Sequence, residues 1–171
     1  MKPGIYSDIL NSYYHAKPGL SSSGLSRLAQ SPAHYRSYKA NPPEQTKEML
    51  IGSAVHAAVL EDGFNSGLIL QSPGSTRGTN LYKEFVKANP GRILLLEDEV
   101  VTVQKATEAV MNHSVAKELL TGGKAEQSAF WTDPATGVLC KCRPDYLRDD
   151  GLVIDLKTSQ DASPDGFQRA I

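Results

Sequence analysis

The period of the hydrophobic pattern changes at Gly122 and Gly123, and no other feature limits the possible folds as strongly. Before these glycines, apolar residues recur about every 3.6 positions, as they do on one face of a helix. After them, apolar residues alternate or run together between turn sequences at residues 133–137 and 149–151, which is typical of β-strands. The pattern therefore predicts an α/β protein in which helices precede an antiparallel meander of three strands.

Start and stop signals place the elements along the chain. Serines at 21–23 begin a short helix that ends before Pro32, and Ser163 followed by Pro164 begins another helix. Hydrophobic spacing gives the remaining elements. They are helices at residues 46–61, 81–88 and 100–120, and strands at residues 126–132, 138–147 and 152–157. Apart from the helix at 81–88, residues 64–92 are expected to form loops.

The helix at 46–61 is expected to carry a functional histidine. Residues at helical spacing are predicted to form its inward face, and these are Met49, Gly52, Ser53, His56, Val59 and Leu60. A buried histidine on a helix is more often a satisfied core residue than a ligand, so His56 gains significance only with acidic partners. Gly52 and Ser53 are small and would let the helix approach a neighbouring segment closely.

Length and composition indicate one ordinary globular domain. The chain has 171 residues, of which 40% are apolar and 22% charged, and its formal net charge is −1. Residues 1–45 are expected to form an N-terminal extension with short helices, and residues 46–171 the core. No apolar run reaches the roughly 18 residues of a membrane-spanning helix and no signal peptide is evident, so we expect a cytoplasmic protein without a membrane partner. The charge balance argues against a histone-like DNA binder, but it leaves room for local basic patches.

Two aspartates and a lysine in the strand region carry the strongest chemical signal. Asp145 follows Arg143 and Pro144, and Asp155 comes ten residues later, two positions before Lys157. Since side chains alternate along a strand, Asp155 and Lys157 point to one face. Two carboxylates brought together repel each other, and a shared proton or a bound cation relieves the repulsion. The pair is a candidate metal site, and a structural metal or salt-bridge site with no role in nucleic-acid chemistry is the alternative.

The loop between the last two strands decides whether Asp145 joins Asp155. A three-residue loop with Gly151 at positive φ pairs Arg148 with Leu152, and the register then places Asp145 opposite Asp155. A loop of two or four residues would put the aspartates on opposite faces. Glycine at the third loop position favours the three-residue form.

These residue types suit metal-dependent hydrolysis of a phosphodiester. Hard carboxylate oxygens from Asp145 and Asp155 suit Mg²⁺ or Mn²⁺, which can bridge a phosphodiester and lower the pKa of bound water. Lys157 would then orient or deprotonate the attacking water, or neutralise charge on the phosphate. His56 could complete the metal shell.

The sequence resembles a known nuclease family at several places along the chain. Pro144, Asp145, Asp155 and Lys157 resemble the PD-(D/E)xK nuclease signature, with residues 154–158 as its hallmark strand. The segments that resemble, in the same order, the nuclease domain of the exonuclease VIII (RecE-type) family are residues 52–61, 130–133 with 136–137, and 142–145. The resemblance covers residues 21–171. It implies a restriction-endonuclease-like core, similar to lambda exonuclease, in which a central mixed sheet containing the meander is flanked by helices.

The resemblance also implies a role for individual residues. The metal would be held by the carboxylates of Asp145 and Asp155, the backbone carbonyl of Leu156 and the ring of His56. Lys157 would be the catalytic lysine. In the family a later helix supplies a tyrosine and a glutamine that contact the substrate. The sequence stops before this helix, so the core is expected to be incomplete at its C-terminus.

Three further residues are weaker candidates. Glu126 resembles an acidic family position near the metal, and an exposed residue at a strand edge is an equal alternative. Lys141 and Arg143 could line a groove for DNA phosphates, although scattered basic residues more often form ordinary solvated surface.

The function that the resemblance implies is a Mg²⁺-dependent exodeoxyribonuclease. It would digest double-stranded DNA ends 5′ to 3′ without ATP, in recombination of the phage or prophage type. The implied partners are duplex DNA, a single-strand annealing protein and further copies of the chain in a ring-shaped oligomer. The alternative is a truncated, inactive remnant that serves as a DNA-binding or partner-binding module.

Overall fold

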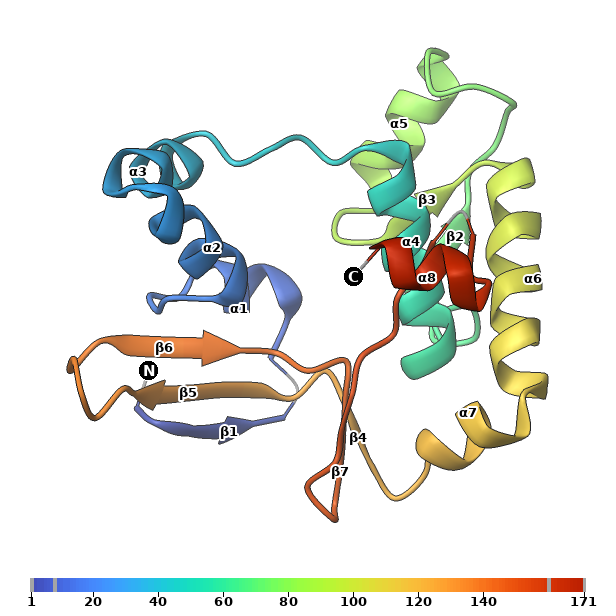
Figure 1. Ribbon diagram of the computed structural model, residues 1–171. Coiled ribbons are helices and arrows are strands. Elements are labelled where there is room, and N and C mark those ends of the chain that lie inside the picture. The colour runs from blue at the N-terminus through green and yellow to red at the C-terminus, as the bar shows by residue number, and fades with distance from the viewer. Residues whose placement is uncertain (1, 8, 160, 171) are drawn as a thin grey trace. The chain divides into compact units, whose positions relative to one another are not determined.

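The chain folds into two compact units, each built from two separate stretches of sequence. The computed structural model describes residues 2–7, 9–159 and 161–170. Unit 1 comprises Met1–Gln45 and Gly122–Ile154, and unit 2 comprises Thr46–Thr121 and Asp155–Ile171. Figure 1 shows the elements of both units in chain order.

Unit 1 begins with short helices that the local sequence caps. They are α1 (Asn11–Ala16), α2 (Ser22–Gln30) and α3 (Pro32–Ala40). Ser21 caps α2 by accepting a hydrogen bond from the backbone N–H of Gly24, which confirms the helix predicted there. Ser31 ends α2 and caps α3, whose first residue is Pro32. In the sequence, Pro32 was interpreted only as the end of the preceding helix, so α3 was not predicted.

The strands of unit 1 form two antiparallel sheets. The first has the order β1-β5-β6, and its strands are β1 (Gly4–Tyr6), β5 (Ser128–Thr132) and β6 (Leu139–Cys142). The second has the order β4-β7-β8, and its strands are β4 (Gly123–Ala125), β7 (Tyr146–Arg148) and β8 (Val153–Ile154). The rings of Tyr6 and Tyr14 meet Phe130 edge-on, each at 6.0 Å between centroids, and form the apolar centre beside the first sheet.

These two sheets replace the single meander that the sequence predicted. The predicted first strand starts later, at Ser128, because Glu126 has a φ of +53° and separates β5 from β4. The predicted second strand breaks at Pro144. A left-handed residue turns the chain out of the extended form, and proline has no N–H for the ladder. The mixed α/β class is confirmed. In the described part of the chain, however, the strands form three small sheets, and the expected central mixed sheet is not among them.

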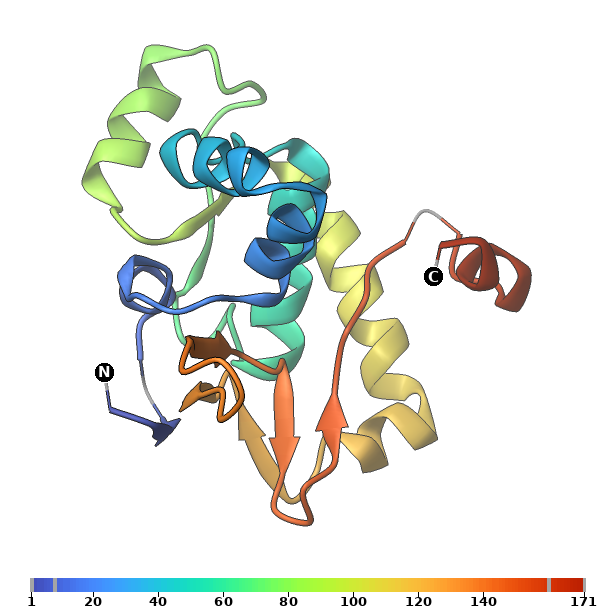
Figure 2. The same cartoon turned by 60° about the vertical axis from the view of Figure 1, so that its left-hand side comes forward.

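The hairpin between β7 and β8 has the predicted three-residue loop, and Figure 2 shows its two strands side by side, in orange-red. Gly151 has a φ of +87°, and the N–H of Arg148 donates to the carbonyl of Leu152 at 2.9 Å. Tyr146 pairs with Ile154 in the resulting register. The glycine therefore sets the register that the sequence argument required.

Unit 2 is a helical unit with one small parallel sheet. Its helices are α4 (Lys47–Leu60), α5 (Asn80–Ala88), α6 (Glu97–Asn112), α7 (Ser114–Leu119) and α8 (Pro164–Ala170). The sheet pairs β2 (Ile69–Gln71) with β3 (Ile93–Leu95). The helices confirm the predicted segments, with a break before Ser114. Both strands were missed, because a strand of three residues is too short to show a period of two.

The core of unit 2 corrects the predicted face of α4. Its buried residues are Ala54, Val55, Ala57, Ile69, Leu95, Val100 and Val103. The inward stripe of α4 therefore consists of small apolar residues, whereas Met49 is 51% exposed and Ser53 is also exposed. Because α4 is apolar on most sides, its hydrophobic spacing does not identify one face. His56 is half-buried.

Across the described residues, no helix has both the length and the apolar character that crossing a bilayer requires.

Candidate metal-binding and catalytic residues

The residues singled out from the sequence divide between the two units. Unit 1 contains Glu126, Lys141, Arg143 and Asp145. Unit 2 contains His56 on α4 and the segment 155–157, which directly follows β8. Each unit therefore contributes both an acidic residue and a basic one.

Two carboxylates lie close together in unit 1. Glu126 follows β4 and Asp145 precedes β7, and the N–H of Glu126 donates to the carbonyl of Asp145 at 2.9 Å. Carboxylate oxygens of the two side chains lie within 4.8 Å of each other. Both residues are half-buried, so Glu126 is not the exposed edge residue that the sequence left open as an alternative. The backbone bond continues the β4–β7 pairing and thereby fixes both residues.

Arg143 holds the Glu126 carboxylate in place. Its Nε donates to Oε2 of Glu126, and its Nη1 donates to the carbonyl of Ile9 at 2.8 Å. The arginine side chain is only 11% exposed. Arg143 was expected to contact DNA phosphates, but in this structure its guanidinium orients an acidic residue of the candidate site.

Lys141 does not lie where a DNA contact would need it. The residue is 5% exposed, and its Nζ donates to the carbonyls of Tyr14, His15 and Lys17 at 2.8, 3.3 and 2.6 Å. Burial lowers the pKa of Lys141, and the positive charge of Lys39 lowers it further. These three carbonyls lie at the C-terminal end of α1, where a cation is favoured. Lys141 thus ties α1 to β6, and the expectation of a phosphate contact is corrected.

In unit 2, Asp155 and Lys157 point away from the protein core. Leu156 lies between them in sequence and packs against the core cluster of α4 and α6. Because neighbouring side chains of an extended segment alternate, the flanking residues turn outward. The Nζ of Lys157 donates to Oδ1 of Asp155 at 2.6 Å, and the two side chains are 62% and 56% exposed. The sequence prediction that these two residues share a face is confirmed.

The helix α4 passes close to this segment within unit 2. A Cβ added to Gly52 would lie 3.1 Å from Oγ1 of Thr158, which is tighter than ordinary side-chain contact. Glycine at 52 therefore lets residues 155–159 run along α4, one helical turn from His56. The sequence argument expected this close approach from the small residues beside His56.

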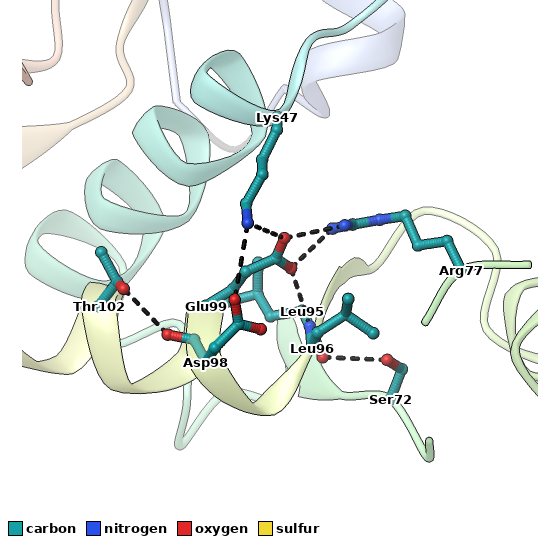
Figure 3. Close-up of polar contacts among 8 residues, drawn as sticks. All are labelled: Lys47, Ser72, Arg77, Leu95, Leu96, Asp98, Glu99 and Thr102. Carbon is teal, nitrogen blue, oxygen red and sulfur yellow. Dashed lines mark hydrogen bonds and ion pairs between the residues drawn. The ribbon is translucent and has the colours of Figure 1, made fainter. Parts of the chain in front are cut away.

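One charged cluster of unit 2 was missed from the sequence (Figure 3). Glu99 is 1% exposed, and its carboxylate accepts two hydrogen bonds from Arg77, at 2.8 and 2.6 Å, and one from the N–H of Leu96 at 2.9 Å. The Nζ of Lys47 lies 3.6 Å from Glu99. Arg77 neutralises this buried carboxylate. A glutamate three residues into a helix is the only sequence signal of the cluster.

Residues 21–171 match the model of a protein family described as a PDDEXK-like domain of unknown function, DUF3799. The chain belongs to this family. No curated protein matches the chain. The match covers α2 through α8 and every candidate residue named above. The match supports membership of the PD-(D/E)xK superfamily, whose signature Asp145, Asp155 and Lys157 resemble.

The acidic residues of this PDDEXK-like domain fit a divalent metal. Glu126 and Asp145 offer hard oxygen donors within 4.8 Å of each other, and Mg²⁺ and Mn²⁺ prefer such donors. Two carboxylates this close repel each other unless a proton or a cation lies between them. A bound cation would relieve this repulsion. PDDEXK-like nucleases generally use divalent metals, and the chemistry of this pair agrees.

Proposed function

We propose that this PDDEXK-like domain is the nuclease core of a Mg²⁺-dependent exodeoxyribonuclease that acts on double-stranded DNA ends. The observation that carries the proposal is the carboxylate pair of Glu126 and Asp145 in a chain of this family. The finer features come from the resemblance to the exonuclease VIII family. They are 5′ to 3′ digestion without ATP and a role in phage-type recombination beside a single-strand annealing protein.

The proposed metal ligands are Asp145, Asp155, His56 and the backbone carbonyl of Leu156, as the family resemblance implies. The three-residue loop of the β7–β8 hairpin, on which the sequence argument for the two aspartates depended, supports this proposal. When bound, the ion would supply an activated water and neutralise charge on the phosphate. We propose that Glu126, held by Arg143, adds negative charge beside Asp145.

Lys157 is the proposed catalytic lysine. Its ammonium is exposed and is held by Asp155 on the outer side of the segment, so it can reach a bound phosphodiester. There it would orient the attacking water or balance the charge that develops on the phosphate oxygens. Leu156 anchors the segment in the core and so limits the movement of both neighbours.

The direct test is digestion of a linear duplex labelled at the 5′ end on one strand and internally on the other. Closed circular duplex and single-stranded DNA of the same sequence are the control substrates, with Mg²⁺, Mn²⁺ or EDTA present. We expect metal-dependent release of nucleotides from the linear duplex alone, with the 5′ label lost first. Lys157→Ala should abolish digestion, whereas Lys105→Ala, which removes an exposed lysine of α6, should not.

Two results would contradict the proposal in different ways. Digestion of the circle would show an endonuclease and would refute the requirement for an end. Binding of the duplex without digestion in either metal would replace the enzyme with the DNA-binding module that the sequence left as the alternative.

A further inference from the structure

A long N-terminal stretch of unit 1 contains no acidic residue. Residues 9–43 include Lys17, Arg27, Arg36 and Lys39 but no aspartate or glutamate. The formal net charge of the whole chain is −1, so the rest of the chain is net negative. The stretch contains α2 and α3, which form a helical hairpin (Figure 2). This separation of charge is not visible in the overall composition.

Three of these cations are exposed residues of the hairpin helices. Arg27, Arg36 and Lys39 all lie on the exposed side of the hairpin helices, and in the described ranges none of them forms an ion pair. By contrast, Arg77 and Arg143 each bind a carboxylate. We call Arg27, Arg36 and Lys39 the basic hairpin surface.

Close contacts between α2 and α3 fix the two helices that carry this surface. Gly24 of α2 lies so close to α3 that an added Cβ would meet the ring of Tyr35 at 3.2 Å. The hydroxyls of Ser23 and Tyr38 link the helices at 3.3 Å. Arg36 and Lys39 are three positions apart on α3 and so lie on one face of the helix. Two cations with fixed spacing can contact neighbouring phosphates with little further ordering.

The positive charge of Lys39 acts on other groups of unit 1. The pKa of Lys141 is lowered by burial and then by Lys39. The pKa of His15 is also lowered, first by burial, then by Lys141 and Arg143, and to a smaller extent by Lys39, against an opposing effect of Glu126. Both groups therefore lie in a positive field to which the exposed Lys39 contributes.

We propose that the basic hairpin surface binds the phosphate backbone of duplex DNA, apart from the metal-binding residues. Only the choice of DNA as the polyanion rests on the proposed function, because a domain of a nuclease-type family must hold its substrate. The hydroxyl group of Ser37 accompanies the cations on α3 and can also donate to phosphate. The surface would contribute affinity and position without reading sequence.

The test is DNA binding by the full chain without catalysis. A fluorescein-labelled 30-bp duplex is titrated in EDTA at several salt concentrations, and anisotropy is recorded. The test variant is Arg36→Gln with Lys39→Gln. The matched control is Lys83→Gln with Lys87→Gln, which removes two exposed lysines from α5. Arg36→Lys with Lys39→Arg preserves both charges. Circular dichroism verifies that each variant is folded.

We expect the test variant to bind the duplex on the order of tenfold more weakly at ~0.1 M salt. The slope of log association constant against log salt concentration should be shallower by ~1.8, because two phosphate contacts are lost. The control and the charge-preserving variant should match the wild type. Unchanged affinity and slope in the test variant would overturn the proposal, as would equal losses in the control. Loss of binding to phosphatidylglycerol vesicles with DNA binding intact would assign the surface to a membrane instead. Because the assay contains no divalent metal, failed digestion does not affect its outcome.

Discussion

Two carboxylate–cation pairs of unit 2 differ in almost every physical respect. Glu99 is 1% exposed and is bound by Arg77, the Leu96 N–H and Lys47, whereas Asp155 is 56% exposed and is bound by Lys157. Removing one partner of a buried pair leaves a charge without water or counter-charge, which is costly. An exposed pair contributes little, since water replaces either partner. The first pair is therefore fixed in place, and the second is free to exchange partners.

Because of this difference, the buried pair serves the stability of the fold and the exposed pair is suited to chemistry. A carboxylate that must bind metal or substrate cannot already be saturated by strong hydrogen bonds. In the described part of the chain, the Asp155 carboxylate is 56% exposed and is paired with the exposed Lys157, while Glu99 has its oxygens occupied from several sides. Changes at the exposed pair should therefore affect activity, and changes at the buried pair should affect folding.

The largest expected effect is on catalysis by the exposed pair. Lys157→Ala should lower metal-dependent digestion of linear duplex on the order of 1,000-fold, or about 4 kcal/mol of transition-state stabilisation, as expected for a group that handles a proton or transition-state charge. Its free energy of unfolding should stay within about 0.5 kcal/mol of wild type, because the side chain is exposed. Nuclease rates and urea denaturation of the same preparation measure both quantities. Equal activity in the two proteins would remove Lys157 from the site.

The next effect concerns the stability of the buried pair. Glu99→Ala should lower the free energy of unfolding by about 3 kcal/mol, because Arg77 and the Leu96 N–H lose their acceptor. Asp155→Ala should cost less than about 1 kcal/mol. Urea denaturation followed by circular dichroism compares the two variants. A loss at Asp155 as large as that at Glu99 would mean that exposure does not distinguish the pairs.

A smaller effect is expected from metal binding. Mg²⁺ at tenfold its dissociation constant should stabilise the wild type by about 1.4 kcal/mol, because the ion binds only the folded site. Asp155→Asn should lose most of this gain, and Glu99→Gln should retain it. Thermal melts at increasing Mg²⁺ and Mn²⁺ follow the shift. Melting temperatures that ignore both ions in the wild type would show that no functional metal site is present.

The smallest effect is a dependence of stability on pH. Burial alone would raise the pKa of Glu99, but hydrogen bonds from Arg77 and Leu96 and the charges of Arg77 and Lys47 outweigh it, so its pKa lies below the usual 4.5. A carboxyl with a depressed pKa in the folded state stabilises the fold above its unfolded pKa. This stability should be lost as the pH falls below about 4.5 and through the folded pKa. The urea midpoints of wild type and Glu99→Gln should converge as the pH falls from 6 to 3. On the order of two measurements per pH unit are enough to follow this change. Parallel curves would exclude Glu99 as the titrating group.

Local signals in the sequence predicted the helices and one decisive turn. Ser21 and Thr46 accept capping hydrogen bonds at the helix starts where they were expected. Gly151 adopts positive φ and sets the β7–β8 register. These features depend on residues within one turn of each other, so the chain alone specifies them. For the same reason, the alternation around Leu156 correctly placed Asp155 and Lys157 on one face.

Features that depend on distant partners could not be predicted in this way. Strand β1 forms only because β5, more than a hundred residues later, offers it a free edge, and β2 pairs with β3 across an intervening helix. The break at Glu126 depends on a left-handed backbone that no local sequence signal indicates.

The sequence by itself determined which residue types could do the chemistry, and the tertiary structure decided which charges are available for it. Lys141, Arg143 and Arg36 are similar in sequence, as cations among polar or small neighbours. Folding buries Lys141 against three carbonyls and pairs Arg143 with Glu126, and it leaves Arg36 exposed. A charge is available only if its solvation is not replaced by fixed partners, and those partners come from segments that only the folded chain brings together.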